Sequence, residues 1–117
     1  MEIQAHPKLS VAIIAKNEQE IIRGCLESVK DADQIVVLDT GSGDDTVIIA
    51  NKYTQLVFQE EWEDDFSKMY NLACSACNGD WILSIDADEQ LEDGGIWKIR
   101  RLLKNSMERV YRLQLEY

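Results

Sequence analysis

The chain has 117 residues, of which 45% are hydrophobic and 29% are charged. This length and this apolar fraction suit one folded domain, and they exclude a disordered chain or two separate domains. The 22 acidic residues outnumber the 12 basic ones and give a net charge of −10, which repels phosphate backbones, so we expect no nucleic-acid partner.

In chain order, short β-rich runs alternate with segments whose apolar residues recur at helical spacing. Strands are predicted over residues 9–15, 34–39, 56–59, 81–86 and 110–115, and helices over 17–29, 44–52, 66–77 and 96–104. Asn17 is expected to cap the first helix, with Glu20 completing a capping box. Apolar strands that alternate with helices predict an α/β fold, a Rossmann-like, doubly wound and mostly parallel sheet in a single domain spanning residues 1–117.

Polar residues follow three of the predicted strands. Lys16, Asn17 and Glu18 follow the first strand, Asp39 ends the second, and residues 86–89 end the fourth. The carboxyl ends of parallel strands meet at one edge of a sheet, where such folds bind their ligands. We therefore expect these side chains to lie around one crevice.

Asp86 and Asp88 are two residues apart just beyond a hydrophobic strand, so both carboxylates can face one cation. Oxygen ligands suit Mg²⁺ or Mn²⁺, which are commonly shared with substrate phosphates. The sequence has no G-x-x-x-x-G-K-[ST] loop that could hold phosphates without a metal. The pattern predicts a divalent cation that bridges these carboxylates to an anionic ligand.

The three cysteines, Cys25, Cys74 and Cys77, could form a zinc site only together with His6. They fall inside helix-patterned segments, so we interpret them as reduced thiols of a cytoplasmic protein. The first apolar run is too short for a signal peptide, and no stretch is long enough to span a bilayer.

Three other interpretations of the acidic motifs are weaker. Residues 39–42 read D-T-G-S, as in aspartic proteases, but those proteins are nearly all β. Residues 86–90 could belong to a dehalogenase-type phosphatase, whose signature lies on the first strand and continues to Thr or Val where this chain has Gln90. An EF-hand beginning at Asp86 would have Leu91 in place of its glycine and Trp97 in place of its last glutamate.

Four ordered blocks resemble family 2 glycosyltransferases of the GT-A type, closest to bacterial members that build cell-surface glycans or glycosylate peptides. The blocks are A-I-I-A-K-N-E (12–18), I-V-V-L-D-T-G-S-G-D-D-T (35–46), D-F-S-K with Asn71 (65–71) and G-D-W-I-L-S-I-D-A-D-E (79–89). The resemblance covers residues 9–103 and implies the N-terminal, donor-binding half of an incomplete GT-A domain.

The resemblance also implies roles for individual residues. It gives nucleotide-sugar binding to a set of six and metal ligation to two: Ala15, Asn17, Glu18, Asp39, Lys68 and Asp86 for the donor, and Asp88 with Asp86 for Mn²⁺ or Mg²⁺. Asp39 would hydrogen-bond the base, typically uracil, and Lys68 would lie near the base or diphosphate. The expected donor is therefore a nucleotide sugar, most simply UDP-linked, and the expected acceptor is a glycan, a lipid-linked molecule or a peptide.

The sequence departs from the family pattern in two ways. Tyr70 stands where members with the D-F block have arginine, and no residue matches the family's catalytic base. Two alternatives therefore stay open: a module that binds nucleotide without turnover, and a metal-dependent nucleotidyltransferase, although Lys16–Gln19 offers no glycine for the latter. The last predicted strand would be an exposed edge, which predicts pairing with a second copy. We expect a cytoplasmic location, at the inner face of the membrane if the acceptor is lipid-linked.

Overall fold

The computed structural model describes residues 7–104 and 112–114. In chain order its elements are β1 (Leu9–Ala15), α1 (Ile22–Val29), β2 (Gln34–Asp39), α2 (Thr46–Ala50), β3 (Val57–Gln59), α3 (Phe66–Ser75), β4 (Trp81–Asp86), α4 (Gly95–Lys104) and β5 (Arg112–Gln114). The bounds of β1, β2 and β4 coincide with the predicted ones. Mostly buried, apolar runs rich in Val, Ile and Leu define these three strands.

The strands form one sheet in the order β3-β2-β1-β4-β5. Every pair of strands in the described part of the chain is parallel, which confirms the predicted doubly wound arrangement. The chain first moves outward from β1 through β2 to β3, and then returns to the other side of β1 to form β4. This reversal places the switch point of the sheet beside β1, where folds of this class open a crevice.

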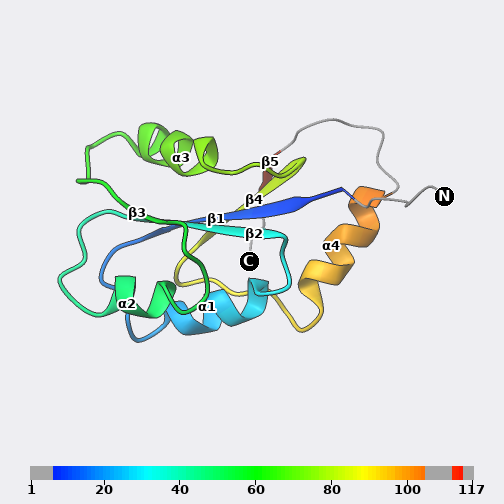
Figure 1. The fold of residues 1–117 in the computed structure, drawn as a ribbon, viewed down its shortest axis with the longest axis horizontal. Coiled ribbons are helices and arrows are strands. Elements are labelled where there is room, and N and C mark those ends of the chain that lie inside the picture. Colours follow the sequence, from blue (N-terminus) through cyan, green and yellow to red (C-terminus); the bar gives the residue numbers. More distant parts are fainter. Residues whose placement is uncertain (1–6, 105–111, 115–117) are drawn as a thin grey trace.

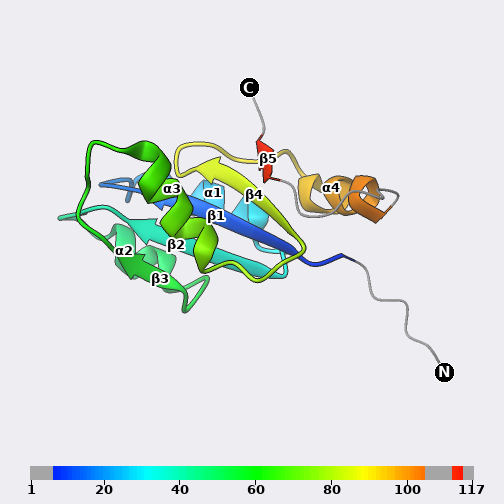
Figure 2. The same cartoon turned by 90° about the horizontal axis from the view of Figure 1, so that it is seen from above.

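Helices cover both faces of the sheet (Figure 1). Alternate residues of β1 point to one face and pack with α1 and α4 around a large core; its buried members include Leu9, Val11 and Ile13, all 0% exposed. The opposite face carries a smaller core, in which Ala12 and Leu38 contact Met69 of α3. Figure 2 shows α3 crossing above the strands, so a single helix covers that face.

The predicted start of the first helix is wrong. Helix α1 begins at Ile22, and its N-cap, Ile21, makes no side-chain capping bond. Asn17 instead has a positive φ of 52° and lies in the loop that follows β1. Its side chain is used by a neighbouring loop, described below, so neither Asn17 nor Glu20 caps the helix.

The other differences are at the ends of elements. Helix α2 is shorter than predicted, because the chain turns directly after Ala50. Trp81 is buried, and Trp97 is 56% exposed and packs under the guanidinium of Arg100 at 4.9 Å. Strand β5 lies at the edge of the sheet within the predicted range, and pairing with a second copy stays a prediction. None of the helices in the described residues has the length and apolarity to cross a membrane.

Candidate donor and cation site

The structure brings the acidic strand ends to one edge of the sheet. Ala15 pairs with Asp39 across the β1–β2 ladder, and Ile14 pairs with Asp86 across the β1–β4 ladder. Asp39 and Asp86 therefore end the two strands on either side of β1. This convergence follows from the parallel topology, as the sequence predicted.

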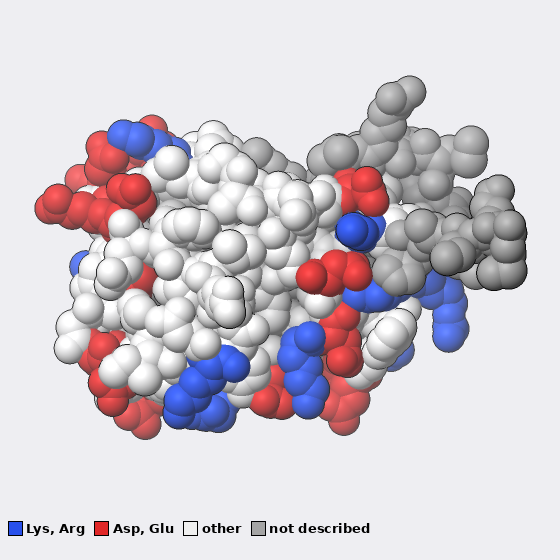
Figure 3. Space-filling view, in the orientation of Figure 1, with Lys and Arg blue, Asp and Glu red and all other residues white. Residues whose placement is uncertain are grey.

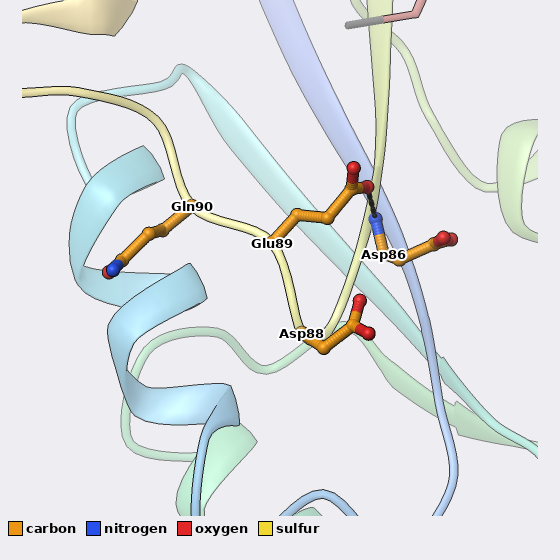
Figure 4. Close-up of a pocket in the computed structure, with 4 residues that line it drawn as sticks. All are labelled: Asp86, Asp88, Glu89 and Gln90. Atoms are coloured by element: carbon orange, nitrogen blue, oxygen red, sulfur yellow. Dashed lines mark hydrogen bonds between the residues drawn. The ribbon is translucent and has the colours of Figure 1, made fainter. Parts of the chain in front are cut away.

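The residues beyond β4 form an acidic loop, residues 86–91. An open hollow of about 410 Å³ is lined by four of them: Asp86, Asp88, Glu89 and Gln90. In the close-up, Asp88 and Asp86 extend from the same stretch of chain, and Glu89 folds back toward the end of β4 (Figure 4). Glu89 Oε1 accepts a hydrogen bond of 2.8 Å from the Asp86 backbone amide, which fixes the turn. We call this space the acidic hollow.

The carboxylates of the acidic hollow are poorly compensated. Asp88 makes no hydrogen bond or ion pair within the part of the chain that the structure describes. Burial raises the pKa of Asp86 above its ordinary value, and the negative charges of Glu89 and Asp88 raise it further. Such repulsion indicates a place where a cation would be stabilised.

The donor set of the acidic hollow fits a hard divalent cation. Carboxylate oxygens are the ligands that Mg²⁺ and Mn²⁺ prefer. Among the described residues, no three Cys, His, Asp or Glu side chains converge to form a complete metal cage. That arrangement suits a cation that takes one or two carboxylates from the protein and its remaining ligands from water and a substrate phosphate.

Asp39 has a different environment from Asp88. Its side chain is 1% exposed, and its Oδ2 accepts hydrogen bonds from the backbone amides of Gly41 (3.2 Å) and Ser42 (3.0 Å). Its Oδ1 accepts from the hydroxyl of Ser42. The turn depends on Gly41, whose φ of 119° is unfavourable for other residues. Asp39 thus determines the shape of the loop after β2.

The loops after β1 and β2, residues 16–19 and 40–46, are joined by side chain-to-backbone hydrogen bonds, and we call them the paired loops. The Asn17 amide donates to Ser42 Oγ, and Asn17 Oδ1 accepts from the Gly43 amide, both at 2.8 Å. The Glu18 amide donates to Thr46 Oγ1, also at 2.8 Å. Sequence reasoning missed this network; its signal was the group of short polar residues after both strands.

Lys68 lies on the first turn of α3, whose N-terminal end is at the same side of the sheet as the strand ends (Figure 1). Its Nζ forms an ion pair of 2.6 Å with Glu63, and its backbone amide donates to the capping residue Asp65. The hydrogen bond with Glu63 raises the pKa of Lys68. Acidic side chains gather around this helix end in Figure 3. Lys68 is not among the residues that line the acidic hollow.

Tyr70 stands at the position where members with the D-F block have arginine. Its ring stacks on Phe66 with ring centroids 6.3 Å apart, so Tyr70 is a packing residue there.

The three cysteines are free thiols, and His6 lies outside the described residues. Within the described residues no cluster of ligands could hold zinc, and the interpretation as reduced thiols stays a prediction.

Comparison with known proteins gives a family. A model described as Glycosyl transferase family 2 matches residues 10–111. A TPR repeat-containing protein of Synechococcus elongatus is 46% identical over 88 residues, covering 74% of this chain and 22% of that protein. The glycosyltransferase SunS of Bacillus subtilis is 38% identical over 104 residues, covering 84% of this chain and 25% of that enzyme. The chain thus spans about a quarter of the length of these relatives.

A solved structure shares the fold. Glucosyl-3-phosphoglycerate synthase of Mycobacterium tuberculosis, in complex with Mg²⁺ and UDP, is 25% identical, with a TM-score of 0.60. The match covers 72% of this chain and 35% of that one. Another structure of that enzyme holds Mn²⁺ and UDP-glucose and matches with a TM-score of 0.69.

Proposed function

Because this chain belongs to glycosyl transferase family 2, we propose that it binds the nucleotide-sugar donor in a metal-assisted transfer of the sugar to an acceptor. The observation that carries the proposal is the acidic hollow at the switch point of the sheet, with Asp88 uncompensated in a protein of charge −10. A UDP-linked donor is favoured, since a structural neighbour is described in complex with Mg²⁺ and UDP.

In this proposal the paired loops form the nucleotide side of the site. Ala15, Asn17 and Glu18 border the base, and Asp39 lies behind them. A carboxylate offers about four lone-pair directions, and three donors from the turn already use Asp39, so one direction is left. Because Asp39 is 1% exposed, the turn would have to open for an N–H of a base such as uracil to reach it. Lys68 would approach the base or diphosphate after exchanging its partner Glu63 for the ligand.

Asp86 and Asp88 would hold the cation on the other side of β1. The chemistry that such a cation would supply is compensation of the negative charge on the departing nucleoside diphosphate. The diphosphate would lie across the end of β1, between the acidic hollow and the paired loops. The acceptor, which we propose to be a glycan, a lipid-linked molecule or a peptide, and the base that deprotonates it are assigned to no described residue. The free thiols favour a reducing, cytoplasmic compartment.

The proposal is tested by calorimetric titration of UDP and GDP, with and without Mn²⁺, into the wild-type chain and Asp88→Asn. We expect Mn²⁺ to strengthen UDP binding by about tenfold or more in the wild type, and we expect this gain to be lost in the variant. Asp93→Asn is the matched control, because Asp93 is exposed close by but does not line the acidic hollow. Binding that ignores Mn²⁺, or a gain retained in Asp88→Asn, would contradict the role of Asp88.

A module that holds the donor without turnover is the second candidate, and it is favoured by Tyr70, which stacks on Phe66 at the position where members with the D-F block have arginine. The two candidates differ in one assay. Release of UDP from UDP-sugar by the chain, measured by phosphate-coupled detection, would argue for turnover. Binding of UDP with no release above the uncatalysed rate would support the module.

A further inference from the structure

The acidic loop rests on one face of helix α1 rather than standing free in solvent. In Figure 4 its chain passes beside α1, with Gln90 extending over the helix. Gly24 leaves room for that side chain, since a Cβ there would lie 2.8 Å from Gln90 Oε1. The acidic loop is therefore packed on α1, the helix that follows the first of the paired loops in the chain.

A single hydroxyl, that of Ser28, joins the acidic loop to the helix. Ser28 Oγ accepts a hydrogen bond of 3.0 Å from the Leu91 backbone amide and donates one of 2.7 Å to the Cys25 carbonyl oxygen. A hydroxyl has one proton, so donating to Cys25 orients its lone pairs toward Leu91. At the other end of the loop, the Cys25 thiol lies 3.6 Å from the Asp86 carbonyl oxygen. Residues one turn apart on α1 thus hold both ends of the loop.

The contacts with α1 oppose the repulsion between the carboxylates of the acidic loop. Asp86, Asp88 and Glu89 repel one another, and that repulsion favours a more open loop whenever no cation is present. The described contacts that oppose opening are the hydrogen bond of Glu89 to the Asp86 amide and the contacts with α1. Asp86 also pairs with Ile14 of β1, and Ala87 and Leu91 are buried in the core, but the bonds from Ser28 and Cys25 are the described side-chain bonds from another element to the loop backbone.

We propose that Ser28 is a positioning residue, which keeps the acidic loop in the shape that a divalent cation and a diphosphate require. This inference rests on the proposed function of the acidic hollow and adds a residue that touches neither ligand. Its consequence is that the loop is preformed, so ligand binding does not have to order it. Ser28 then affects the cation-dependent part of donor binding and leaves the cation-independent part unchanged.

Ser75 provides a matched control. Its Oγ donates to the Leu72 carbonyl oxygen at 2.7 Å, the same type of bond within a helix that Ser28 makes. Ser75 accepts no hydrogen bond from a loop amide in the part of the chain that the structure describes. A serine that matters only to its own helix should behave alike at both positions.

The experiment compares the wild-type chain with Ser28→Ala, Ser28→Thr and Ser75→Ala, and Ser28→Cys serves as a second variant of nearly unchanged volume. Amide hydrogen exchange is measured without ligand, and UDP is titrated with and without Mn²⁺. In Ser28→Ala we expect exchange of the Leu91 amide to accelerate about tenfold and the Mn²⁺-dependent gain in UDP affinity to fall by about fivefold. Ser28→Thr keeps the hydroxyl, so the Leu91 exchange rate and the Mn²⁺-dependent gain should both stay at the wild-type values. Ser28→Cys should give values between those of the wild type and Ser28→Ala, and Ser75→Ala should match the wild type in both measurements.

Two failures are distinguishable. If the wild type binds UDP with help from Mn²⁺ and Ser28→Ala or Ser28→Cys keeps the full gain, the positioning role of Ser28 is wrong while the donor site stands. If Mn²⁺ does not affect UDP binding to the wild type, the proposed function fails, and the inference fails with it. An equal loss in Ser75→Ala would also overturn the inference, because it would show a general effect of helix stability.

Discussion

On one side of β1 the paired loops join their carboxyl and hydroxyl groups to backbone amides, whereas on the other side the acidic loop leaves its carboxylates facing solvent. Asp39 accepts three hydrogen bonds and is buried, while Asp88 accepts none within the described chain and is exposed. The two loop systems begin at adjacent strands, and both contain aspartates. Their difference shows that an aspartate at a strand end can either build a loop or be kept available for a ligand.

The buried Asp39 and the exposed aspartates of the acidic loop should have opposite effects on the stability of the folded chain. A buried carboxylate that accepts backbone amides stabilises the folded chain, because its removal leaves those amides unsatisfied. A cluster of exposed carboxylates destabilises the folded chain slightly through repulsion. Such a cluster is therefore a candidate for a binding site. The predictions below test this contrast.

The largest effect is expected for Asp39→Ala. Two backbone amides and one hydroxyl lose their acceptor, so the free energy of unfolding should fall by about 3 kcal/mol in urea denaturation. Asp45→Ala is the control, since Asp45 is exposed in the same loop, and it should change stability by less than about 0.5 kcal/mol. A loss below about 1 kcal/mol in Asp39→Ala would remove the distinction between the two loop systems.

The pH dependence of stability should have opposite signs on the two sides. A hydrogen bond from the Thr46 hydroxyl lowers the pKa of Asp44, so its contribution is present above the ordinary value of 3.8 and is lost as the pH falls. Burial and the neighbouring carboxylates raise the pKa of Asp86, so the folded chain loses stability as the pH rises above 3.8 and Asp86 ionises. Relative to wild type, Asp44→Asn should lose stability with rising pH, and Asp86→Asn should gain it.

Urea midpoints measured between about pH 3 and pH 6 would show this contrast. The added cation is a further control: Mn²⁺ should reduce the difference between wild type and Asp86→Asn and leave Asp44→Asn unaffected. Parallel pH curves for the two variants would show that both aspartates serve the fold in the same way.

A smaller effect concerns the thiol beneath the acidic loop. Burial raises the pKa of Cys25 to about 12, with further increases from Glu89, Asp86 and Asp88, and burial raises that of Cys77 to about 11. At pH 8 an aromatic disulfide reagent should therefore react with Cys77 before Cys25, and with Cys25 only on unfolding. Mass spectrometry of the labelled peptides identifies each site, with Cys77→Ser as the control. Rapid labelling of native Cys25 would mean that the loop does not cover it.

The smallest effect is expected for Gly24→Ala. The new methyl group meets only the end of the flexible Gln90 side chain, which can move aside, and alanine favours the helix. Stability should change by less than about 1 kcal/mol, and hydrogen exchange at the Leu91 amide should stay slow because Ser28 still holds it. Faster exchange at Leu91 in this variant would assign the loop contact to Gln90 instead.

The sequence predicted the sheet well because its signals are local. Strands β1, β2 and β4 are mostly apolar runs, and their parallel order places Asp39 and Asp86 beside β1 whatever the loops do. The start of α1 was mispredicted because Asn17 had two uses. Its capping propensity competes with hydrogen bonds to the loop after β2, and the sequence does not show that this partner is near. For the same reason the sequence gives no signal that Ser28 bonds to the Leu91 amide.

Strand β1 pairs with β2, made shortly after it, and with β4, made only after most of the chain. A nascent chain leaving the ribosome could thus form the β1–α1–β2 unit early, but one side of β1 would keep its amides and carbonyls unpaired until residues 81–86 emerged. An unfinished chain would present an apolar strand edge to other chains. Synthesis paused before residues 81–86 have left the ribosome should therefore yield more chaperone-bound or aggregated product than a pause after they have emerged and paired with β1.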